Sequence, residues 1–336
     1  MTANHPSPLL PRLMQAGMTA LQAGDLDGAL LQFGAARRIA PTDSGLLRSL
    51  AALYQHAARW GDLWSVAETG LALHPDDAGF SIARIAALTG AGFTAAALTL
   101  AQAQCRATPD DPQLAQHHGN LLLLSGDAVT ALQIGKIALT RHPDMPGLLG
   151  MAAEAAFRLG DHAAARGWLD QAVRLEPQNR TLRMARATML LSLGDWAPGL
   201  ADYEYRLLPD ATREIVRRDL HIPRWQGEDL RQRCLLVVSE QGVGDQMRFL
   251  RDIIALQPLC GRMIVECAAR LVPLLRRSLP EAIAVVAAEE QRDGRRHVFD
   301  YGWLASQSHG MGGADFYIEM GSIMLRLFER GVTPER

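Results

Sequence analysis

Apolar residues in the first part of the chain recur three and four positions apart, with polar residues between them. Residues at this spacing lie on one face of an α-helix. Each such segment therefore predicts an amphipathic helix that packs its apolar face against another helix. Two alanine-rich segments illustrate the pattern, one with Ala29, Phe33 and Ala36 and the other with Ala165, Leu169 and Ala172.

Prolines and glycines divide this helical pattern at a fixed interval. Glycine precedes proline by 17 residues in four places, the first being Gly24 and Pro41. A glycine permits the left-handed conformation that ends one helix, and a proline ends the next because it lacks an N–H. The sequence therefore predicts tandem helix–turn–helix units of 34 residues. The prolines that set this period are Pro41, Pro75, Pro109, Pro143 and Pro177.

The second unit departs from the common spacing. Gly61 precedes Pro75 by only 14 residues. This shorter interval predicts that one turn of helix has moved from the second helix of the unit to the first. We therefore expect a local kink or an irregular surface there.

A 34-residue unit with these glycine, alanine and proline positions resembles the tetratricopeptide repeat. The resemblance covers residues 10–206 as about six repeats. It implies a superhelical solenoid, because each helix pair buries its apolar face only against neighbouring pairs. It also implies a groove that binds a protein or peptide through the first helix of each repeat.

The candidate groove residues lie on these first helices. Carboxylate-clamp repeats use lysines, and the asparagine ladder of the eukaryotic O-GlcNAc transferase needs many asparagines. The chain has one lysine, Lys136, and three asparagines, so both types of groove are disfavoured. A groove of mixed apolar and polar character remains, although some of its residues could instead pack between helices. The candidates are Met14, Met18, Ile82, Gln116, Asn120, Glu154, Phe157, Met184 and Thr188.

Beyond residue 206 the pattern changes to alternating strands and helices. An arginine-rich linker is expected over residues 207–230. Short apolar runs then predict buried parallel strands, separated by segments with helical spacing. This order is typical of a doubly wound α/β sheet, whereas residues 291–313 are expected to form a loop. The expected strands are Cys234–Ser239, Arg262–Cys267 and Ile283–Ala287.

A glycine turn directly follows the first expected strand. Glycines there let the backbone approach a ligand, and the N-terminus of the next helix offers N–H groups to an anion. Two structural interpretations stay open, since Asp245 could cap that helix and the two residues after the strand could hydrogen-bond the turn. The candidate site comprises Asp245 as the catalytic residue, with Glu240, Gln241, Gly242 and Gly244 forming the turn beside a ligand.

Four segments in this part of the chain are Gly199–Arg206, Trp225–Glu228, Glu240–Asp245 with Arg248, Phe249 and Arg251, and Asp315–Ser322. Together they resemble a bacterial family that joins tetratricopeptide repeats to a glycosyltransferase-like domain related to heptosyltransferases. The resemblance covers about residues 195–328, with Ile323-Met324 where that family usually has Leu-Pro. It implies that Asp245 is the base for the acceptor hydroxyl and that Gly242 and Gly244 shape the turn.

A transferase of that architecture has two Rossmann-like halves, and the second half mainly holds the nucleotide-sugar. Residues 231–336 number 106, which is enough for one half. The expected fold is therefore a flexible N-terminus over residues 1–9, an all-α tetratricopeptide solenoid, and a smaller α/β Rossmann-like half-domain that forms only part of a glycosyltransferase-like domain.

Two functions follow from this organisation, so whether the chain is an enzyme stays open. In the first, it is a protein-interaction module fused to an incomplete and inactive glycosyltransferase-like half-domain. In the second, it is a glycosyltransferase acting on a protein or an envelope glycan. Its repeats would then select the acceptor, and the donor half would be supplied in trans or lost by truncation. A nucleotide-sugar is expected to bind only with a complementing half.

Composition narrows the partners further. The chain of 336 residues has 34 basic and 36 acidic side chains, so no basic excess attracts nucleic acid. Residues 85–105 carry no charge and imitate a membrane span, but they contain glycines and glutamines and lie in register with the repeats. We therefore expect no membrane span. No secretory signal pattern opens the chain, and a cytoplasmic location is expected.

The positions of the histidines and cysteines in the sequence do not indicate a metal site or a reactive thiol. His117 and His118 are adjacent on one predicted helix and point in different directions, so no metal site is expected there. No cofactor is expected either. A homodimer that covers the open face of the half-domain remains an alternative. The four cysteines contain no Cys-x-x-Cys pair, and buried thiols are expected at two of them, Cys234 and Cys267.

Overall fold

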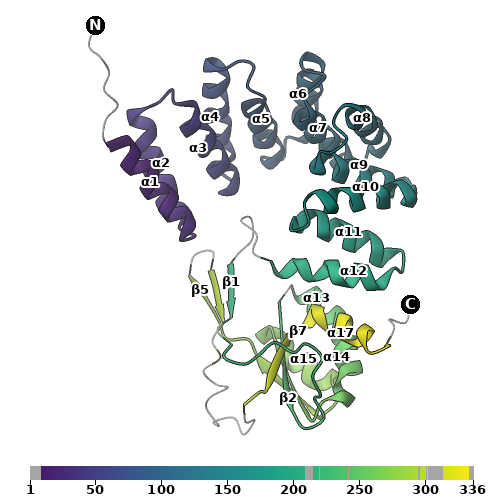
Figure 1. Ribbon diagram of the computed structural model, residues 1–336. Coiled ribbons are helices and arrows are strands. Elements are labelled where there is room, and N and C mark those ends of the chain that lie inside the picture. Colours follow the sequence, from purple (N-terminus) through teal and green to yellow (C-terminus); the bar gives the residue numbers. More distant parts are fainter. Residues whose placement is uncertain are drawn as a thin grey trace. The chain divides into compact units, whose positions relative to one another are not determined.

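The computed structural model describes residues 9–208, 215–218, 220–240, 242–293, 296–299, 301 and 313–332. The chain divides into two compact units, residues 1–185 and residues 186–336. Among the described residues the first unit is helical, and the second contains the end of the helical array and all the strands (Figure 1). The expected flexible N-terminus lies outside the described residues, except for Leu9.

The described residues contain twelve consecutive helices that form six pairs (Figure 1). The predicted tandem of helix pairs is therefore confirmed. The helices are α1 (Leu9–Gln22), α2 (Leu26–Ile39), α3 (Ser44–His56), α4 (Trp60–Leu73), α5 (Ala78–Gly90), α6 (Thr94–Ala107), α7 (Pro112–Leu124), α8 (Ala128–Arg141), α9 (Pro146–Arg158), α10 (His162–Leu175), α11 (Arg180–Ser192) and α12 (Trp196–Tyr203).

Local sequence sets the ends of these helices. Asp25 accepts a 2.8 Å hydrogen bond from the N–H of Gly28 at the start of α2, and Asp127 accepts one of 3.0 Å from Thr130 at the start of α8. Such carboxylates satisfy N–H groups that have no partner inside the helix. Between paired helices, Gly24 has a φ of 74°, in the left-handed region that the glycine period predicts. The same turn therefore recurs in every pair, with one exception.

The exception is the second pair, where the expected kink is wrong. Helix α3 has 13 residues and α4 has 14, the same lengths as in the next three pairs. No turn has moved between them, because Ala58 occupies the position that glycine holds elsewhere and adopts a φ of 54°. Gly61 lies inside α4 instead. The fold thus keeps its register at the cost of a strained alanine.

Small residues bring paired helices close together. A Cβ atom on Gly17 of α1 would lie 2.5 Å from the Phe33 ring of α2, so no larger residue fits. Ala131 and Ala165 are fully buried on α8 and α10. The uncharged stretch 85–105 is divided between α5 and α6, and no helix in the described part of the chain is long and apolar enough to cross a bilayer.

The second unit contains a four-stranded sheet in which every neighbouring pair of strands is parallel. Its strand order is β4-β3-β2-β7. The three strands expected from apolar runs are confirmed, and a fourth, β7, pairs with the opposite edge of β2 from β3. The strands are β2 (Cys234–Val238), β3 (Arg262–Cys267), β4 (Ile283–Ala287) and β7 (Phe316–Glu319).

Short helices connect these strands and pack on the sheet. The helix expected after the glycine turn forms as two pieces, and the segment of helical spacing between the second and third expected strands contains α15. Ile253 and Leu275 are fully buried against β2 and β3 residues in one core. The connecting helices are α13 (Val243–Arg248), α14 (Leu250–Leu256), η2 (Gln257–Leu259), η3 (Ala269–Leu271) and α15 (Val272–Ser278), followed after β7 by η5 (Met320–Ser322) and α17 (Ile323–Glu329).

The segment expected as a linker contributes to this unit. Trp225 is fully buried in the sheet core, and its backbone N–H donates a 2.7 Å hydrogen bond to the carbonyl of Tyr317 on β7. The Tyr317 N–H in turn donates to the carbonyl of Pro223 at 3.0 Å. Residues 223–225 therefore cover the outer edge of β7. The apolar Trp225 side chain explains why this stretch packs rather than remaining exposed.

A second sheet has the order β1-β6-β5. It corrects the expectation of a loop over residues 291–313, because two strands lie at the start of that segment and pair in antiparallel register. In the sequence only Gly294-Arg295 separates them, and β5 contains no apolar residue, so no apolar run predicted a strand there. The remainder of the segment lies largely outside the described residues. The strands are β1 (Ile215–Arg218), β5 (Glu290–Asp293) and β6 (Arg296–Phe299).

Candidate functional site

The candidate groove residues form two rows at equivalent positions of successive repeats. The rows are four residues apart, so they share one face of each first helix. The first row contains Met14, Ile82, Gln116 and Met184, and the second contains Met18, Asn120, Glu154 and Thr188. Phe157 lies outside both rows, three residues after Glu154 on α9.

The second row is the more exposed of the two. Met18 is 47% exposed, and the other three residues of its row are also exposed. Residues of the first row are half-buried. Ile82 packs on the core that includes Ile85 and Leu114, and Gln116 lies against Gly147. The first row therefore combines packing between helices with partial exposure, whereas the second row offers whole side chains to a partner.

These rows carry little charge. The positions between the candidate residues are Arg48 and Gly150 in the first row and Ala52 and Ala86 in the second. Arg48 forms an ion pair with Asp77. Glu154, which is the acidic member of the rows, pairs with Arg158 at 2.7 Å. The faces of the first helices thus present thioether, amide, hydroxyl and methyl groups, with the charges neutralised inside the chain.

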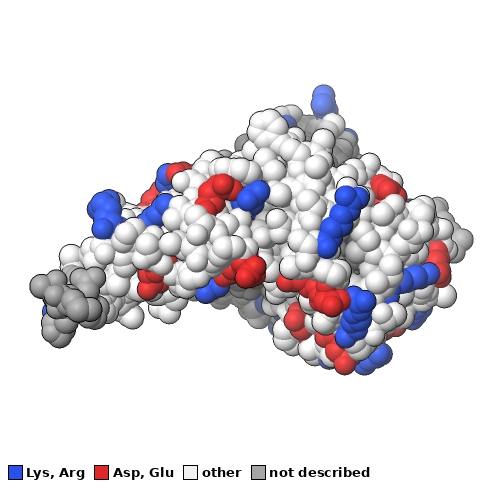
Figure 2. Space-filling view, turned by 90° about the horizontal axis from the view of Figure 1, so that it is seen from above, with Lys and Arg blue, Asp and Glu red and all other residues white. Residues whose placement is uncertain are grey.

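Charges of both signs are also mixed elsewhere on the surface. Figure 2 shows basic and acidic side chains interspersed over the visible face, with wide uncharged areas between them. No broad area of one sign gathers on the part of this face that the structure describes. This distribution differs from the continuous basic patch or stripe that is typical of nucleic-acid-binding surfaces.

A different site lies at the carboxyl ends of the four parallel strands. In open parallel sheets, ligands bind outside these ends at the point where the strand order reverses. Here the order reverses between β2 and β7. The segment Ser239–Glu240 follows β2, and η5 follows β7, so these two segments border the expected ligand position.

Arg206 occupies this position with its own side chain. Its guanidinium donates to both carboxylate oxygens of Glu240, at 2.7 and 3.0 Å, and to a carboxylate oxygen of Glu204 at 2.8 Å. It also donates to the hydroxyl of Ser322 at 2.7 Å. The Arg206 side chain is only 2% exposed. A charge buried to this degree needs such partners, because its desolvation is costly.

A second arginine extends the cluster. Arg224 donates to Glu204 at 2.6 Å, to Glu319 at 2.7 Å and to Ser322 at 2.8 Å. Burial favours the neutral form of Glu204, but hydrogen bonds and charge from Ser322 and the two arginines outweigh it and hold the pKa of this carboxyl below its ordinary value of 4.5. We call Glu204, Arg206, Arg224, Glu240, Glu319 and Ser322 the switch-point cluster.

Glu240 also ties the two strand ends together. Its carboxylate accepts a 2.7 Å hydrogen bond from the backbone N–H of Gly321 in η5. A Cβ at Gly321 would come within 3.0 Å of both the Glu240 and the Arg206 side chains. Only glycine therefore fits at this position. The carboxylate expected beside a ligand is therefore already bonded to groups of the chain itself.

A neighbouring cluster surrounds Glu266 near the end of β3. This carboxylate, 2% exposed, accepts hydrogen bonds from the N–H and hydroxyl of Ser239, at 3.1 and 2.9 Å, and from Arg218 at 2.8 Å. Arg218 also donates to Tyr301 and stacks over the Phe299 ring at 4.0 Å. Burial, and then the charge of Glu266, raise the pKa of Tyr301. These partners satisfy Glu266, which indicates a structural role.

Asp245 also lies near the carboxyl ends of the parallel strands. Its carboxylate has no hydrogen-bond partner among the described residues. It lies in the first turn of α13, half-buried. Gly242 is the N-cap of this helix, so the interpretation of Asp245 as its N-cap is wrong. Gly242 and Gly244 are exposed, and a Cβ at Gly244 would meet no atom within 4 Å. Gln241 lies outside the described residues.

A hollow of about 540 Å³ lies at the opposite end of the same sheet, before β2 and β3. Its arginines have acidic neighbours, since Arg231 pairs with Asp229 at 2.7 Å and Arg233 pairs with Asp315 at 3.0 Å. Hydrogen bonds from the Cys234 N–H and from Arg233 hold the pKa of Asp315 below its ordinary value. This hollow is separated from Asp245 by the length of β2.

Comparison with known proteins bears first on the helical region. The profile of the family described as tetratricopeptide repeat matches residues 122–189. The helical region is a tetratricopeptide solenoid. Its fold resembles a chain of the APC/C hetero-tetramer Cut9–Hcn1, with 16% identity over 60% of this chain and 40% of that chain, at a TM-score of 0.50. A tetratricopeptide protein of Thermus thermophilus is 23% identical over 54% of this chain and 99% of its own, at a TM-score of 0.46.

One curated relative is more similar in sequence. Protein FlbA of Caulobacter vibrioides is 32% identical over 191 residues, or 55% of this chain. The chain covers 32% of FlbA, so it spans about a third of that relative's length.

Sequence reasoning missed most of the switch-point cluster. Arg206 and Ser322 belong to segments that carry the family resemblance, but nothing in the sequence indicated that they meet across 116 positions. The clearest available signal was the buried strand pattern of Leu235–Val238, which places the following Glu240 at the strand end. Pairing of that carboxylate with Arg206 depends on the packing of η1 (Glu204–Leu207), which local sequence does not encode.

Proposed function

We propose that this chain binds an extended, largely uncharged protein segment along the first helices of its tetratricopeptide solenoid. A protein-interaction role is the general function of such repeats. The observation that carries the finer proposal is the second row of exposed side chains, in which Met18, Asn120 and Thr188 occupy equivalent positions of different repeats. Amide and hydroxyl groups can hydrogen-bond a peptide backbone, while methionine adapts to varied apolar side chains.

Substitutions in this row test the proposal. Peptides selected from a random library for binding to the intact chain are titrated against Asn120→Arg and Thr188→Arg. We expect at least about a tenfold loss of affinity, which corresponds to 1.4 kcal/mol. The matched control is Gln133→Arg, which adds the same charge to an exposed position of α8, a second helix. Unchanged binding in both row variants would contradict the proposal.

For the second unit we propose an inactive relative of one half of a glycosyltransferase-like domain, with a Rossmann-like arrangement of its parallel sheet. The switch-point cluster supports this view, because Arg206 and Glu240 fill the edge where such sheets bind ligands. The isolated chain is therefore expected to give no heat of binding with nucleoside diphosphate sugars in calorimetry. Saturable binding of any of them would refute the inactive assignment.

The alternative is an active glycosyltransferase whose repeats select a protein or envelope-glycan acceptor. It is favoured by the carboxylate of Asp245, which is half-buried and unbonded by the described residues, as a general base would be before its substrate binds. Transfer from a nucleotide-sugar would then require a donor half supplied in trans. Sugar transfer that appears on adding such a half and disappears in Asp245→Asn would favour the enzyme over the interaction module alone.

A further inference from the structure

The outer face of α1 differs from the same face of later first helices. In α3, α7 and α9, the three positions that match residues 12, 16 and 19 are buried, and each of these helices packs on the helix before it. In α1 the same positions are exposed. The residues at these three positions are Leu46, Leu50 and Leu53 in α3, Leu148, Ala152 and Ala155 in α9, and Arg12, Ala16 and Thr19 in α1.

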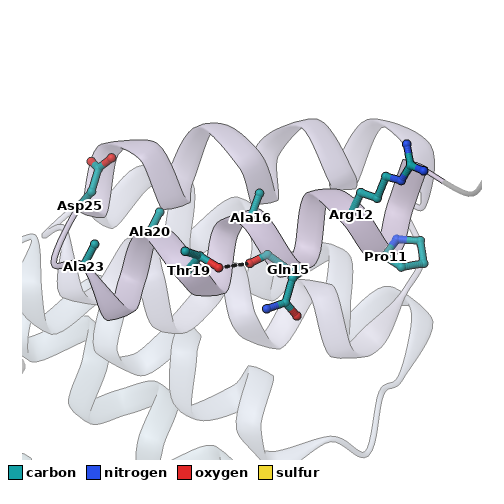
Figure 3. Close-up of a pocket in the computed structure, with 8 residues that line it drawn as sticks. All are labelled: Pro11, Arg12, Gln15, Ala16, Thr19, Ala20, Ala23 and Asp25. Carbon is teal, nitrogen blue, oxygen red and sulfur yellow. Dashed lines mark hydrogen bonds between the residues drawn. The ribbon is translucent and has the colours of Figure 1, made fainter.

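This face of α1 borders a hollow of about 790 Å³ (Figure 3). Figure 3 shows Ala16 and Ala20 between the two ends of this face, with Arg12 at one end and Asp25, beside Ala23, at the other. Three alanines leave room for another helix to approach closely, as the small residues do between paired helices elsewhere in the solenoid. The face therefore has the contour of a helix-packing surface with one charge at each end.

We propose that a second copy of this chain docks on the outer face of α1, with the two α1 helices antiparallel across a twofold axis. An isologous contact of this kind uses the same surface on both copies, so each residue pair occurs twice. Antiparallel helices bring Arg12 of one copy to Asp25 of the other at both ends. Thr19, near the midpoint between these residues, then lies close to the axis.

Charge complementarity is what selects a second copy as the occupant. Arg12 is exposed and has no acidic partner among the described residues. Asp25 uses one carboxylate oxygen for the N–H of Gly28 at 2.8 Å, which leaves the other oxygen for a cation. A face that carries one cation and one anion, at opposite ends, complements itself when it is turned end to end.

The contact leaves the proposed peptide-binding rows open. At 100° per residue, Met14 and Met18 lie more than 90° around α1 from Arg12 and Ala16. Self-association and peptide binding therefore use different sides of the same helix. The inference goes beyond the proposed function, and failure of one leaves the other intact.

The test measures the mass of the intact chain by sedimentation between about 1 and 200 µM. One helix-on-helix contact is a small interface, so we expect a concentration-dependent dimer with a dissociation constant in the micromolar range. Ala16→Glu should weaken the dimer at least about tenfold, because it places two carboxylates in the contact. Leu31→Glu is the matched control, since Leu31 is 68% exposed on α2 and lies outside the contact.

Charge variants test the antiparallel arrangement. Arg12→Gln and Asp25→Asn should each weaken the dimer, and Asn is chosen because it keeps the helix cap. The double variant should be no weaker than either single variant if the two residues pair with each other. A monomer at every concentration, or a dimer that Ala16→Glu and Arg12→Gln leave unchanged, would overturn the proposal.

Discussion

Ala58 is the described non-glycine residue with a positive φ, 54°, and it occupies a turn position that glycine fills in the other pairs. An alanine in the left-handed region costs about 1–2 kcal/mol, and glycine escapes most of this cost while losing more backbone entropy on folding. We therefore expect Ala58→Gly to stabilise the solenoid by about 0.5–1 kcal/mol. Urea unfolding followed by circular dichroism would measure the change.

The neighbouring alanine provides the control for this prediction. Ala57 has a φ of −77°, which any residue adopts without strain. Ala57→Gly should therefore destabilise the chain through backbone entropy alone. Equal effects of the two substitutions would show that the left-handed conformation of Ala58 carries no measurable strain.

His118 should make the solenoid sensitive to acid. Burial holds the pKa of His118 below its ordinary value of 6.5, so the folded state prefers the neutral ring while the unfolded state binds a proton near pH 6.5. The stability contributed by the neutral ring is present above pH 6.5 and is lost as the pH falls below it. His118→Leu places at this position the residue found at Leu50 in α3, and should reduce the difference in thermal midpoint between pH 8 and pH 5.5.

A surface histidine separates this effect from general acid destabilisation. His74 is exposed at the end of α4, and His74→Gln should leave the pH dependence of the midpoint as it is in the parent chain. Burial also lowers the pKa of the neighbouring His117, although the charge of Asp111 partly opposes this shift. Part of the pH dependence should therefore persist in His118→Leu. A slope identical to that of the parent would contradict a buried neutral His118.

At the scale of elements, the helix pairs depend on small residues where two helices meet. Ala165 on α10 is fully buried, and a larger side chain there must displace its neighbours. Ala165→Leu should cost about 1–3 kcal/mol of unfolding free energy through overpacking. Ala163→Leu on the same helix is the control, because Ala163 is exposed and the same change there should cost less than about 0.5 kcal/mol.

Elements with a strong local signal were predictable from sequence. The helical array follows from a period that repeats through the chain, and β4 was placed at Ile283–Ala287, as observed, because its apolar run is bounded by Pro280. Elements held by distant partners were not. The hairpin of β5 and β6 has few apolar residues, and the left-handed turn at Ala58 is imposed by the stacking of helices rather than by alanine itself.

The candidate sites show the same division. The first-helix rows follow directly from the repeat register, so their members could be chosen without coordinates. Around Glu240, by contrast, the partners come from η1, Arg224 and η5, which lie far apart in sequence. Only folding reveals that Arg206 neutralises this carboxylate, and this is why a turn expected beside a ligand is bonded within the chain.

At the scale of the molecule, each unit has its own core, so each should unfold with its own transition. Arg206→Met removes the cation that bonds both carboxylate oxygens of Glu240, and it leaves Glu204 with Arg224 alone, which should cost the second unit about 3–5 kcal/mol. Calorimetry should show one transition moving to lower temperature while that of residues 1–185 stays in place. Arg231→Met, which removes an exposed ion pair, should change neither transition appreciably.

Acid should act on the second unit in the same direction as this substitution. Because the pKa of Glu204 is lowered in the folded chain, its contribution is present above its ordinary value of 4.5 and is lost as the pH falls below it. In Arg206→Met this acid sensitivity should weaken, since Arg206 is one of the groups, with Ser322 and Arg224, that lower this pKa. A single cooperative transition that Arg206→Met shifts as a whole would instead mean that the two units unfold together, and the switch-point cluster would then contribute to the stability of the entire chain.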